Sequence, residues 1–489
     1  MKKRFLAICA MCTSAALAFS GCGIKKETSE TGELAPVTLS WYVRPTAQKD
    51  MQSVQDEMNK YLKEKINAQV EIKRVDPGAY EQKMRVMLSA NEDFDMCYMS
   101  PQYGFLDYIG QNSFLPLDEL LKEYAPKTLA TVPGKFWDAT KVDSKIYGVV
   151  NYQITARAYG FFFDKALSDK YNFDVDSVTS LESTEPFLQA VKDNEGSEMI
   201  PFGIFQNGVW GEMITYYGFN AIDANPGVVR ISDDDFKVVN EFDSPEFTQH
   251  VKTMQNFYSK GFIPKDAAVN TNGRQLYATG KVALTWNNKK PGDTAEVESL
   301  YGNKPLIYKE LAAPFVITSN LMSTLSCISR TSKKPERAMM FLELMNTDKE
   351  LYNMMCFGIE GTHYNKTGEN RIELIPDSGY APNCSWMFGN QFNAYLLPTQ
   401  PDDVWEQTIE LNNSADTSKF LGFVFDPEPV ANEVAQCLSV VKEYTPGLIT
   451  GSVDADKFIP EFNAKLKGAG VDTIVAEKQK QLDAWRAAQ

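Results

Sequence analysis

Apolar residues along the chain follow two alternating patterns, one typical of strands and one typical of helices. Residues 37–42 (VTLSWY), 68–73 (AQVEIK) and 94–98 (FDMCY) are rich in branched and aromatic side chains and predict strands. Between them, residues 51–66 and 80–88 place their apolar side chains on one helical face. Strands that alternate with helices predict an α/β fold with a mostly parallel sheet and helices on both of its faces.

The same alternation continues into the second half of the chain. Residues 160–163 (GFFF) predict a fully buried strand that passes between two structural units. Residues 332–345 predict a helix, because Pro335 falls in its first turn and apolar residues follow at helical spacing. The last forty residues also show a strong helical pattern, so the chain is expected to end in a helical region.

The predicted parallel strands also indicate where a ligand is expected to bind. In such sheets, ligands bind beyond the carboxyl ends of the strands. This rule selects Tyr42, Arg44 and Asp50 after the first strand, and Ser100 and Gln102 after the third. These residues are therefore the first candidates for a binding site.

The N-terminus has the pattern of a bacterial export signal that ends in a lipobox. Three basic residues at positions 2–4 precede an uncharged apolar run at 5–19, and small residues lead to Cys22. The run is too short to span a bilayer, so residues 1–21 are predicted to be a cleaved signal peptide. Lipid on the Cys22 thiol would hold the protein on the cell membrane, facing away from the cytoplasm. The alternative is an ordinary secretory signal with an incidental cysteine.

Composition and charge exclude some partners and indicate the domain count. Removal of residues 2–4 takes the formal net charge from −15 to −18, and no basic run is longer than the pairs at 289–290 and 333–334. Such a chain is not expected to bind nucleic acid. About 450 residues beyond the tether exceed what one core usually holds, so two lobes are expected. The polar segment 22–36 is predicted to be a flexible, lipid-anchored stalk.

Cysteine and histidine usage gives no sign of a metal or redox site. Cys9 and Cys12 leave with the signal, and the five cysteines that follow Cys22 are widely spaced without a C-x-x-C pair. The two histidines, His250 and His363, are more than a hundred residues apart. We therefore expect no metal, no cofactor and mainly buried free thiols.

Several ordered motifs resemble those of a known family. KIYGV at 145–149, GFFFDK at 160–165, GFIPKDA at 261–267 and GKVAL at 280–284 come first. They are followed by ISRTSKKPERAMMFLELM, GIEGTHY, GFVFDPEPV and a close that contains LKGAG and EKQKQLDAW. In this order they resemble extracellular solute-binding proteins of ABC importers, the family-1 class similar to maltose-binding protein. The later motifs resemble a lipoprotein subgroup with a C-terminal extension, often assigned to sugar or aldouronate uptake.

The resemblance implies a periplasmic-binding-protein-like fold with two hinged lobes and an α-helical C-terminal extension. We expect lobe 1 to comprise residues 37–155 and 312–355, and lobe 2 to comprise residues 156–311 and 356–489. The resemblance also implies that the protein captures a carbohydrate, expected to be an oligosaccharide, by hinge closure. ABC permease subunits are the implied protein partner, and the binding protein is expected to act as a monomer.

A sugar presents apolar ring faces and a rim of hydroxyls, so its receptor needs aromatic platforms and short polar side chains. The resulting candidate ligand-binding residues are Trp41, Tyr42, Arg44, Asn151, Gln153, Trp210, Trp286, Asn287, Glu360, His363 and Trp386. For each tryptophan, core packing is an equal alternative. Glu360 and His363 have the alternative of a capped turn at the lobe junction. Arg44 and Arg157 are candidates to pair with the carboxylate of a uronate.

Two other classes of function remain as alternatives. A surface glycoside hydrolase would need a pair of facing carboxylates, and an acidic chain always offers such pairs. A peptide-binding or sensor protein of the same fold would also use aromatic platforms. The sequence contains no G-x-S-x-G or H-E-x-x-H motif and no P-loop, so we predict no catalytic residues and no enzyme activity.

Overall fold

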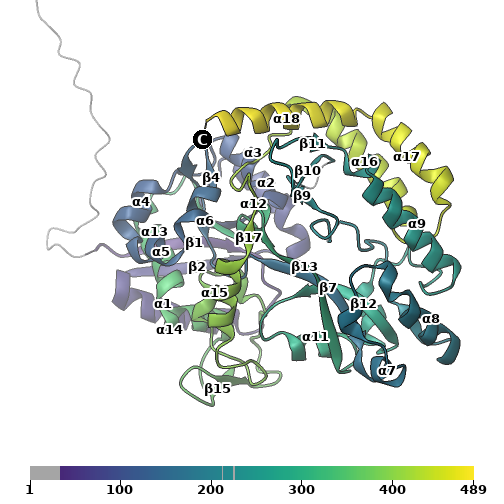
Figure 1. The fold of residues 1–489 in the computed structure, drawn as a ribbon. Helices are drawn as coiled ribbons and strands as arrows, with labels where there is room; N and C mark the ends of the chain where they lie inside the picture. The colour runs from purple at the N-terminus through teal and green to yellow at the C-terminus, as the bar shows by residue number, and fades with distance from the viewer. Residues whose placement is uncertain (1–33, 212, 224–225, 489) are drawn as a thin grey trace, which may run out of the picture.

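The computed structural model describes residues 34–211, 213–223 and 226–488. They form two α/β lobes, with lobe 1 on the left of Figure 1 and lobe 2 on the right. The predicted signal peptide, residues 1–21, and the predicted lipid-carrying Cys22 lie outside the described residues. Among the described residues, no helix is both long enough and apolar enough to cross a membrane.

Lobe 1 is built on a five-stranded sheet in the order β2-β1-β3-β14-β6. Its strands are β1 (Val37–Val43), β2 (Ala68–Arg74), β3 (Met96–Met99), β6 (Val149–Val150) and β14 (Leu325–Ile328). β1 pairs in parallel with β2 and β3, as predicted, but β14 runs antiparallel to both β3 and β6. The sheet is mixed because the chain reaches β14 from lobe 2, through residues 306–321, and not from a strand of lobe 1.

Helices pack against this sheet through the apolar faces that the sequence predicts. In α1, the residues Val54, Met58, Leu62 and Ile66 are buried in the lobe 1 core. The helices of lobe 1 are α1 (Met51–Ile66), α2 (Tyr80–Ser89), α3 (Phe105–Gly110), α4 (Asp118–Tyr124), α5 (Pro126–Thr131), α6 (Gly134–Ala139), α12 (Thr318–Leu321), α13 (Pro335–Thr347), α14 (Lys349–Phe357) and α15 (Val404–Ser414). Two hairpins complete it, β4 (Lys141–Val142) with β5 (Lys145–Ile146) and β15 (Tyr364–Lys366) with β16 (Ile372–Leu374).

Lobe 2 contains a second five-stranded sheet, in the order β17-β13-β7-β12-β8. Its strands are β7 (Arg157–Asp164), β8 (Ile200–Phe202), β12 (Val282–Lys289), β13 (Leu306–Val316) and β17 (Asp416–Thr417). The GFFF segment lies in β7 and is buried, as predicted. Gly160 allows β13 to approach closely, since a Cβ atom there would lie 2.0 Å from the carbonyl oxygen of Lys309.

Helices and a small sheet complete lobe 2. The helices are α7 (Lys165–Lys170), α8 (Glu185–Asn194), α9 (Pro245–Ser259), α10 (Gly273–Ala278) and α11 (Thr294–Leu300). The small sheet has the order β11-β10-β9 and consists of β9 (Phe219–Ala221), β10 (Val228–Arg230) and β11 (Val238–Val239). All its pairs are antiparallel.

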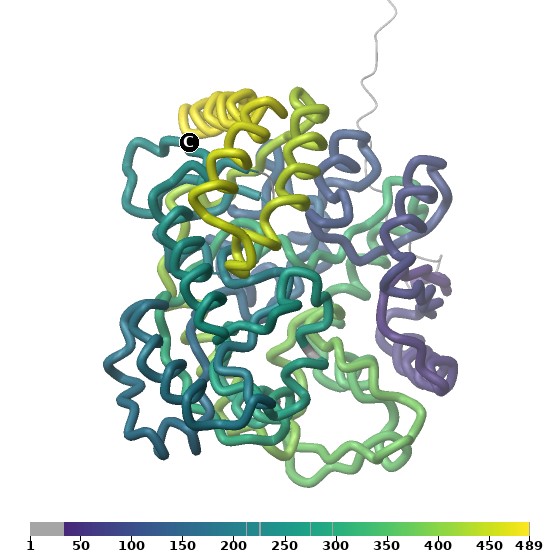
Figure 2. Tube along the Cα trace, turned by 90° about the vertical axis from the view of Figure 1, so that its right-hand side faces the viewer, coloured from purple at the N-terminus to yellow at the C-terminus, as the bar shows by residue number. Residues whose placement is uncertain are grey.

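The C-terminal region is helical, as predicted, and packs on lobe 2. It consists of α16 (Ala431–Ile449), α17 (Ala455–Gly468) and α18 (Val471–Ala487), which lie along the top of Figures 1 and 2. Residues 418–428, here called the strap, lead into it and touch both lobes. Phe420, Phe423 and Phe425 enter the apolar core shared by the C-terminal helices and the small sheet. Leu421 and Val424 pack against the core of lobe 1.

The boundary between the lobes differs from our expectation in two places. Residues 356–411, expected in lobe 2, pack against lobe 1, where Tyr380 and Phe388 belong to its core. Residues 312–316, expected in lobe 1, complete β13 of lobe 2. The chain crosses between the lobes after β6, after β13 and after α15. The third crossing comes later than expected because residues 356–411 first return to cover lobe 1.

The five cysteines of the described residues, Cys97, Cys327, Cys356, Cys384 and Cys437, are free and buried. Burial raises the pKa of each thiol, in Cys384 to about 12. They therefore behave as small apolar side chains of the cores.

Candidate functional site

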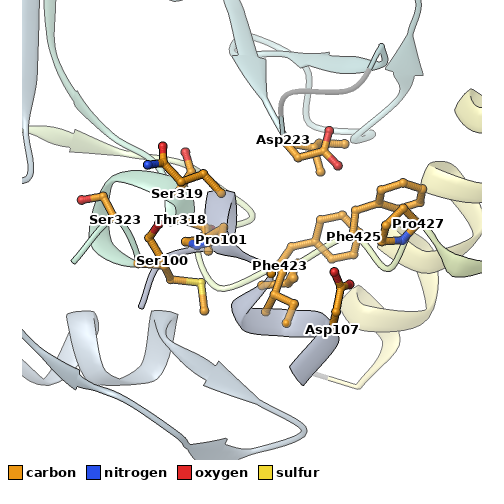
Figure 3. A pocket seen from close by; sticks show the side chains of 16 residues that line it. Ser100, Pro101, Asp107, Asp223, Thr318, Ser319, Ser323, Phe423, Phe425 and Pro427 are labelled. Carbon is orange, nitrogen blue, oxygen red and sulfur yellow. The ribbon is translucent and has the colours of Figure 1, made fainter. Parts of the chain in front are cut away.

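A cavity of about 510 Å³ lies where the two lobes, the second crossing segment and the strap meet (Figure 3). Lobe 1 contributes residues 100–102, 104, 106 and 107, which follow β3. Lobe 2 contributes Ile222 and Asp223, which follow β9. The remaining lining side chains come from two other segments. Where the second crossing enters lobe 1, in and just after α12, they are Thr318, Ser319, Met322 and Ser323, and in the strap they are Phe423, Val424, Phe425 and Pro427. A ligand in this cavity would therefore contact both lobes, a segment that joins them and the strap.

The cavity lies at the carboxyl end of β3, where the sequence predicts a site. Ser100 and Gln102 both line it, as expected for residues that follow a parallel strand. Pro101 begins a short 3₁₀-helix there, and the left-handed turn at Gly104 (φ +76°) leads into α3. This turn directs the chain away from the sheet and leaves space beside the strand end.

An aromatic cluster, composed of Arg44, Tyr98, Tyr103 and Trp386, adjoins the cavity on lobe 1. The Arg44 guanidinium lies 5.9 Å from the ring centroid of Tyr98 and 5.3 Å from that of Tyr103. Trp386 packs edge-on against Tyr98 at a centroid distance of 6.2 Å. The Tyr98 hydroxyl donates a hydrogen bond of 2.9 Å to the carbonyl oxygen of Ser323, a residue that lines the cavity. Burial raises the pKa of Tyr98 to about 12, so this donor keeps its proton.

Polar residues of the first crossing hold this cluster in place. Asn151 is buried, and its amide donates a 2.7 Å hydrogen bond to the carbonyl oxygen of Met387, beside Trp386. Ser326 donates to the Asn151 side-chain oxygen at 3.0 Å. Gln153 is half-buried and donates a 2.9 Å bond to the Thr324 hydroxyl. Asn151 therefore positions the Trp386 segment, whereas Gln153 keeps an accessible surface.

Three of the four candidate tryptophan platforms lie in the hydrophobic cores. Trp41 is fully buried in lobe 1. Trp210 is 3% exposed, and its ring centroid lies 4.5 Å from that of Tyr217. Trp286 is 8% exposed in the core of lobe 2. Trp386 is half-buried and is therefore the tryptophan of this set that retains a substantial accessible face.

The remaining candidates are held by local partners outside the cavity lining. Tyr42 is half-buried against lobe 1, and the Asn287 side-chain oxygen accepts a bond from the next backbone N–H. Glu360 forms a 2.9 Å ion pair with Lys366. His363 is buried, and its Nδ1 accepts a 2.8 Å hydrogen bond from the backbone of residue 359. Glu360 and His363 thus form the local turn that was the alternative interpretation, although it lies in lobe 1.

The structure brings together Arg44, Gln153 and Trp386 with residues that the candidate set omits. Those residues include Tyr98, Asp107, Asp223, Ser323 and the strap phenylalanines Phe423 and Phe425. The GFVFDPEPV motif contains the two phenylalanines, but nothing in their spacing connects them with β3. The position of Tyr98 at the end of a predicted strand was the one available signal.

Two hinged α/β lobes that enclose a polar and aromatic cavity are characteristic of solute-binding receptors. A family model described as "Bacterial extracellular solute-binding protein" matches residues 45–351, more than half of the chain. The chain belongs to this family. A second model, for a domain of unknown function (DUF3502), matches residues 419–487, which include most of the strap and the C-terminal helices.

Individual relatives agree with the family model. A "Carbohydrate ABC transporter substrate-binding protein" of Streptococcus pneumoniae is 29% identical over 436 residues, 87% of this chain and 86% of the relative. The crystal structure of the N-glycan transport solute binding protein NgtS, also from Streptococcus pneumoniae, matches with a TM-score of 0.81 and 26% identity. That match covers 92% of this chain and 99% of NgtS. Complexes of NgtS with Man1GlcNAc and Man5GlcNAc match with TM-scores of 0.72 and 0.69. The α/β fold class and the family resemblance are confirmed.

Proposed function

We propose that this protein is the surface receptor of an ABC importer and captures an oligosaccharide between its lobes for delivery to a permease. The observation that carries the proposal is the cavity, because both lobes, a crossing segment and the strap all contribute to it. The relatives that match most of this chain are described as carbohydrate and N-glycan transport proteins, which supports a sugar ligand. Binding without turnover, and so no enzyme activity, is part of the proposal.

The chemistry of the site suits a sugar. Its volume of about 510 Å³ is in the range of small-molecule sites, and its lining combines apolar with hydroxyl and amide groups. Gln102, Ser319 and Ser323 supply hydrogen-bonding groups, while Phe423 and Phe425 supply aromatic surface. Trp386 extends the aromatic surface beyond the cavity. An oligosaccharide longer than one unit would continue from the cavity toward Trp386.

Hinge closure is the proposed mechanism of capture. The chain matches NgtS with a TM-score of 0.81, but the NgtS complexes with glycans match at 0.72 and 0.69. This difference supports a change of shape on binding and an open form here. A ligand favours the closed form only through its higher affinity for that form, so both lobes must contact the sugar.

The lipid anchor is proposed to attach on the side of lobe 1. Asn67 donates a 2.7 Å hydrogen bond to the carbonyl oxygen of Leu34, and Arg337 donates a 3.0 Å bond to that of Ala35. A lipidated Cys22 would therefore be joined to lobe 1 by residues 22–33, which span at most about 40 Å when extended. Two or more acyl chains give stable attachment to the membrane.

Calorimetry and thermal-shift measurements with mono- and oligosaccharides test the proposal. We expect at least one oligosaccharide to bind and to raise the unfolding temperature, and the same sugar to be recovered intact by chromatography. Hydrolysis products would assign the protein to the alternative class of glycoside hydrolases. Binding confined to a peptide panel included in the same screen would replace the sugar by a peptide ligand.

A further inference from the structure

The C-terminal region reaches the inter-lobe cavity through the strap. Four strap residues line the cavity: Phe423, Val424, Phe425 and Pro427. Figure 3 shows the side chains of Phe423, Phe425 and Pro427 along it. All four are apolar, and Val424 and Pro427 are half-buried and so keep accessible surface. This part of the lining, here called the strap wall, lies within the region that matches the domain of unknown function.

Gln481 of α18 fixes the backbone of the strap wall. Residues 423–427 form neither helix nor strand, so regular backbone pairing does not hold them in place. The Gln481 side-chain oxygen accepts a 2.9 Å hydrogen bond from the Asp426 N–H, and its amide donates a 2.9 Å bond to the Asp426 carbonyl oxygen. Asp426 lies between Phe425 and Pro427, so these two bonds hold the peptide groups on either side of it.

Two further side chains of α18 contact the rings of the strap wall. Trp485 packs edge-on against Phe423, with 6.0 Å between the ring centroids. The Lys478 ammonium lies 5.2 Å from the ring centroid of Phe425 and forms a 2.7 Å ion pair with Asp223, which follows β9 of lobe 2. The helix therefore holds the strap wall at both of its rings as well as at its backbone.

The same side of α18 packs the helix onto lobe 2. Val471, Ile474 and Leu482 are buried in the core that the C-terminal helices share with the small sheet. The three residues that hold the strap wall follow one another at spacings of three and four residues, so they lie on one helical face. α18 thus connects the strap wall to the body of lobe 2.

On the basis of the proposed function, we infer that α18 positions the strap wall against the oligosaccharide, which makes the C-terminal region part of the binding site. The wall supplies apolar surface of the kind that lines small-molecule sites. Groups that are fixed before the ligand arrives bind it more tightly, because less conformational freedom is lost on binding. Gln481 is the positioning residue to test, since it bonds to both backbone groups of Asp426.

Two glutamine variants of α18 test the inference. Gln481→Ala removes both bonds to the strap, and the matched control Gln479→Ala removes a 2.8 Å bond from the Val238 N–H and a 3.2 Å bond to the Phe236 carbonyl oxygen. Each glutamine also bonds to one carboxylate of α18, and residues 236–239 are absent from the described cavity lining. The probe is whichever of Man5GlcNAc, mannotriose, xylotetraose and maltotetraose the wild type binds most tightly in calorimetry. We expect Gln481→Ala to bind this sugar at least about fivefold more weakly, and Gln479→Ala to bind it as the wild type does.

Hydrogen–deuterium exchange of the ligand-free proteins measures the order of the strap directly. The peptide that contains Asp426 should exchange faster in Gln481→Ala than in the wild type, and no faster in Gln479→Ala. Unchanged exchange of this peptide in Gln481→Ala would overturn the inference, as would faster exchange with unchanged affinity. Equal weakening of binding by both variants would assign the effect to a general loss of stability and would also overturn it. If the wild type bound none of the four sugars, the proposed function itself would fail.

Discussion

At the scale of single residues, exposure separates side chains that can face a ligand from those that stabilise a lobe. Trp386 is half-buried and touches Tyr98, the residue whose hydroxyl reaches the cavity lining at Ser323. Trp210 is 3% exposed and surrounded by aromatic rings. The two tryptophans should therefore respond to truncation in opposite ways.

We predict that Trp386→Ala weakens oligosaccharide binding by about tenfold, because one stacking surface of about 1–2 kcal/mol is lost. Its free energy of unfolding should change little. Trp210→Ala should instead lower the free energy of unfolding by about 3–5 kcal/mol, because truncation leaves a cavity in the core. Titration calorimetry and urea unfolding of both variants check the pair. The reverse assignment of the two effects would place the ligand against Trp210.

His250 gives a second prediction at the residue scale. It is 1% exposed, and the Tyr217 hydroxyl lies 2.7 Å from its Nδ1. Burial lowers the pKa of His250 from 6.5 to about 3. As the pH falls below 6.5, the unfolded chain binds a proton that the folded protein does not bind, so acid favours unfolding. Between about pH 7 and pH 5 this residue should remove about 2 kcal/mol of stability.

Unfolding of the wild type and of His250→Gln at both pH values measures this contribution. The variant should be less stable at about pH 7, because it loses a buried hydrogen bond. Its stability should nevertheless fall less between about pH 7 and pH 5 than that of the wild type. Equal losses in the two proteins would mean that His250 takes up its proton in the folded state.

At the scale of elements, the sequence was sufficient to predict those strands and helices whose apolar pattern lies within one continuous segment. The alternation of strands and helices from residue 37 to residue 99 predicted β1, α1, β2, α2 and β3, and the strand-end rule selected Ser100 and Gln102. Sequence could not assign residues 356–411 to lobe 1 or place the strap beside β3, because those contacts join segments far apart in the chain. The sequence could not show that Trp41 is buried for the same reason, since the burial of a strand residue depends on which distant elements cover that strand.

Gly160 provides a prediction for the pairing of two elements, β7 and β13. Gly160→Ala should destabilise lobe 2 by about 3 kcal/mol or more, because its Cβ would lie 2.0 Å from the carbonyl oxygen of Lys309 and must push the strands apart. Gly196→Ala is the control, since nothing lies within 4 Å of a Cβ at Gly196. Urea unfolding compares the two. Similar stability of both variants would show that β13 can shift without cost.

At the scale of the whole molecule, the strap joins the two lobes at a place where they also share the cavity. Gly422 donates a 2.9 Å backbone hydrogen bond to the Thr318 hydroxyl in a crossing segment. Neighbouring strap residues enter both cores. The proposed closure of the lobes would therefore reorient the strap, and with it the Phe423 and Phe425 side chains that line the cavity.

We predict that a saturating oligosaccharide decreases the radius of gyration in small-angle scattering, because the lobes close over it. A sugar that does not bind in calorimetry is the control. Scattering curves that superimpose with and without a tightly bound sugar would show that this receptor binds without hinge motion.

The hydrogen bonds that fix Leu34 and Ala35 to lobe 1 have a consequence for how the receptor is presented to its transporter. The proposed lipid anchor, attached through these residues, would restrict the distance of lobe 1 from the bilayer, and the proposed hinge closure would then move lobe 2 and its C-terminal helices relative to the membrane. Sugar binding would then change the distance between the C-terminal helices and the lipid surface. Energy transfer between a fluorophore on α18 and a dye in the membrane would follow this displacement directly.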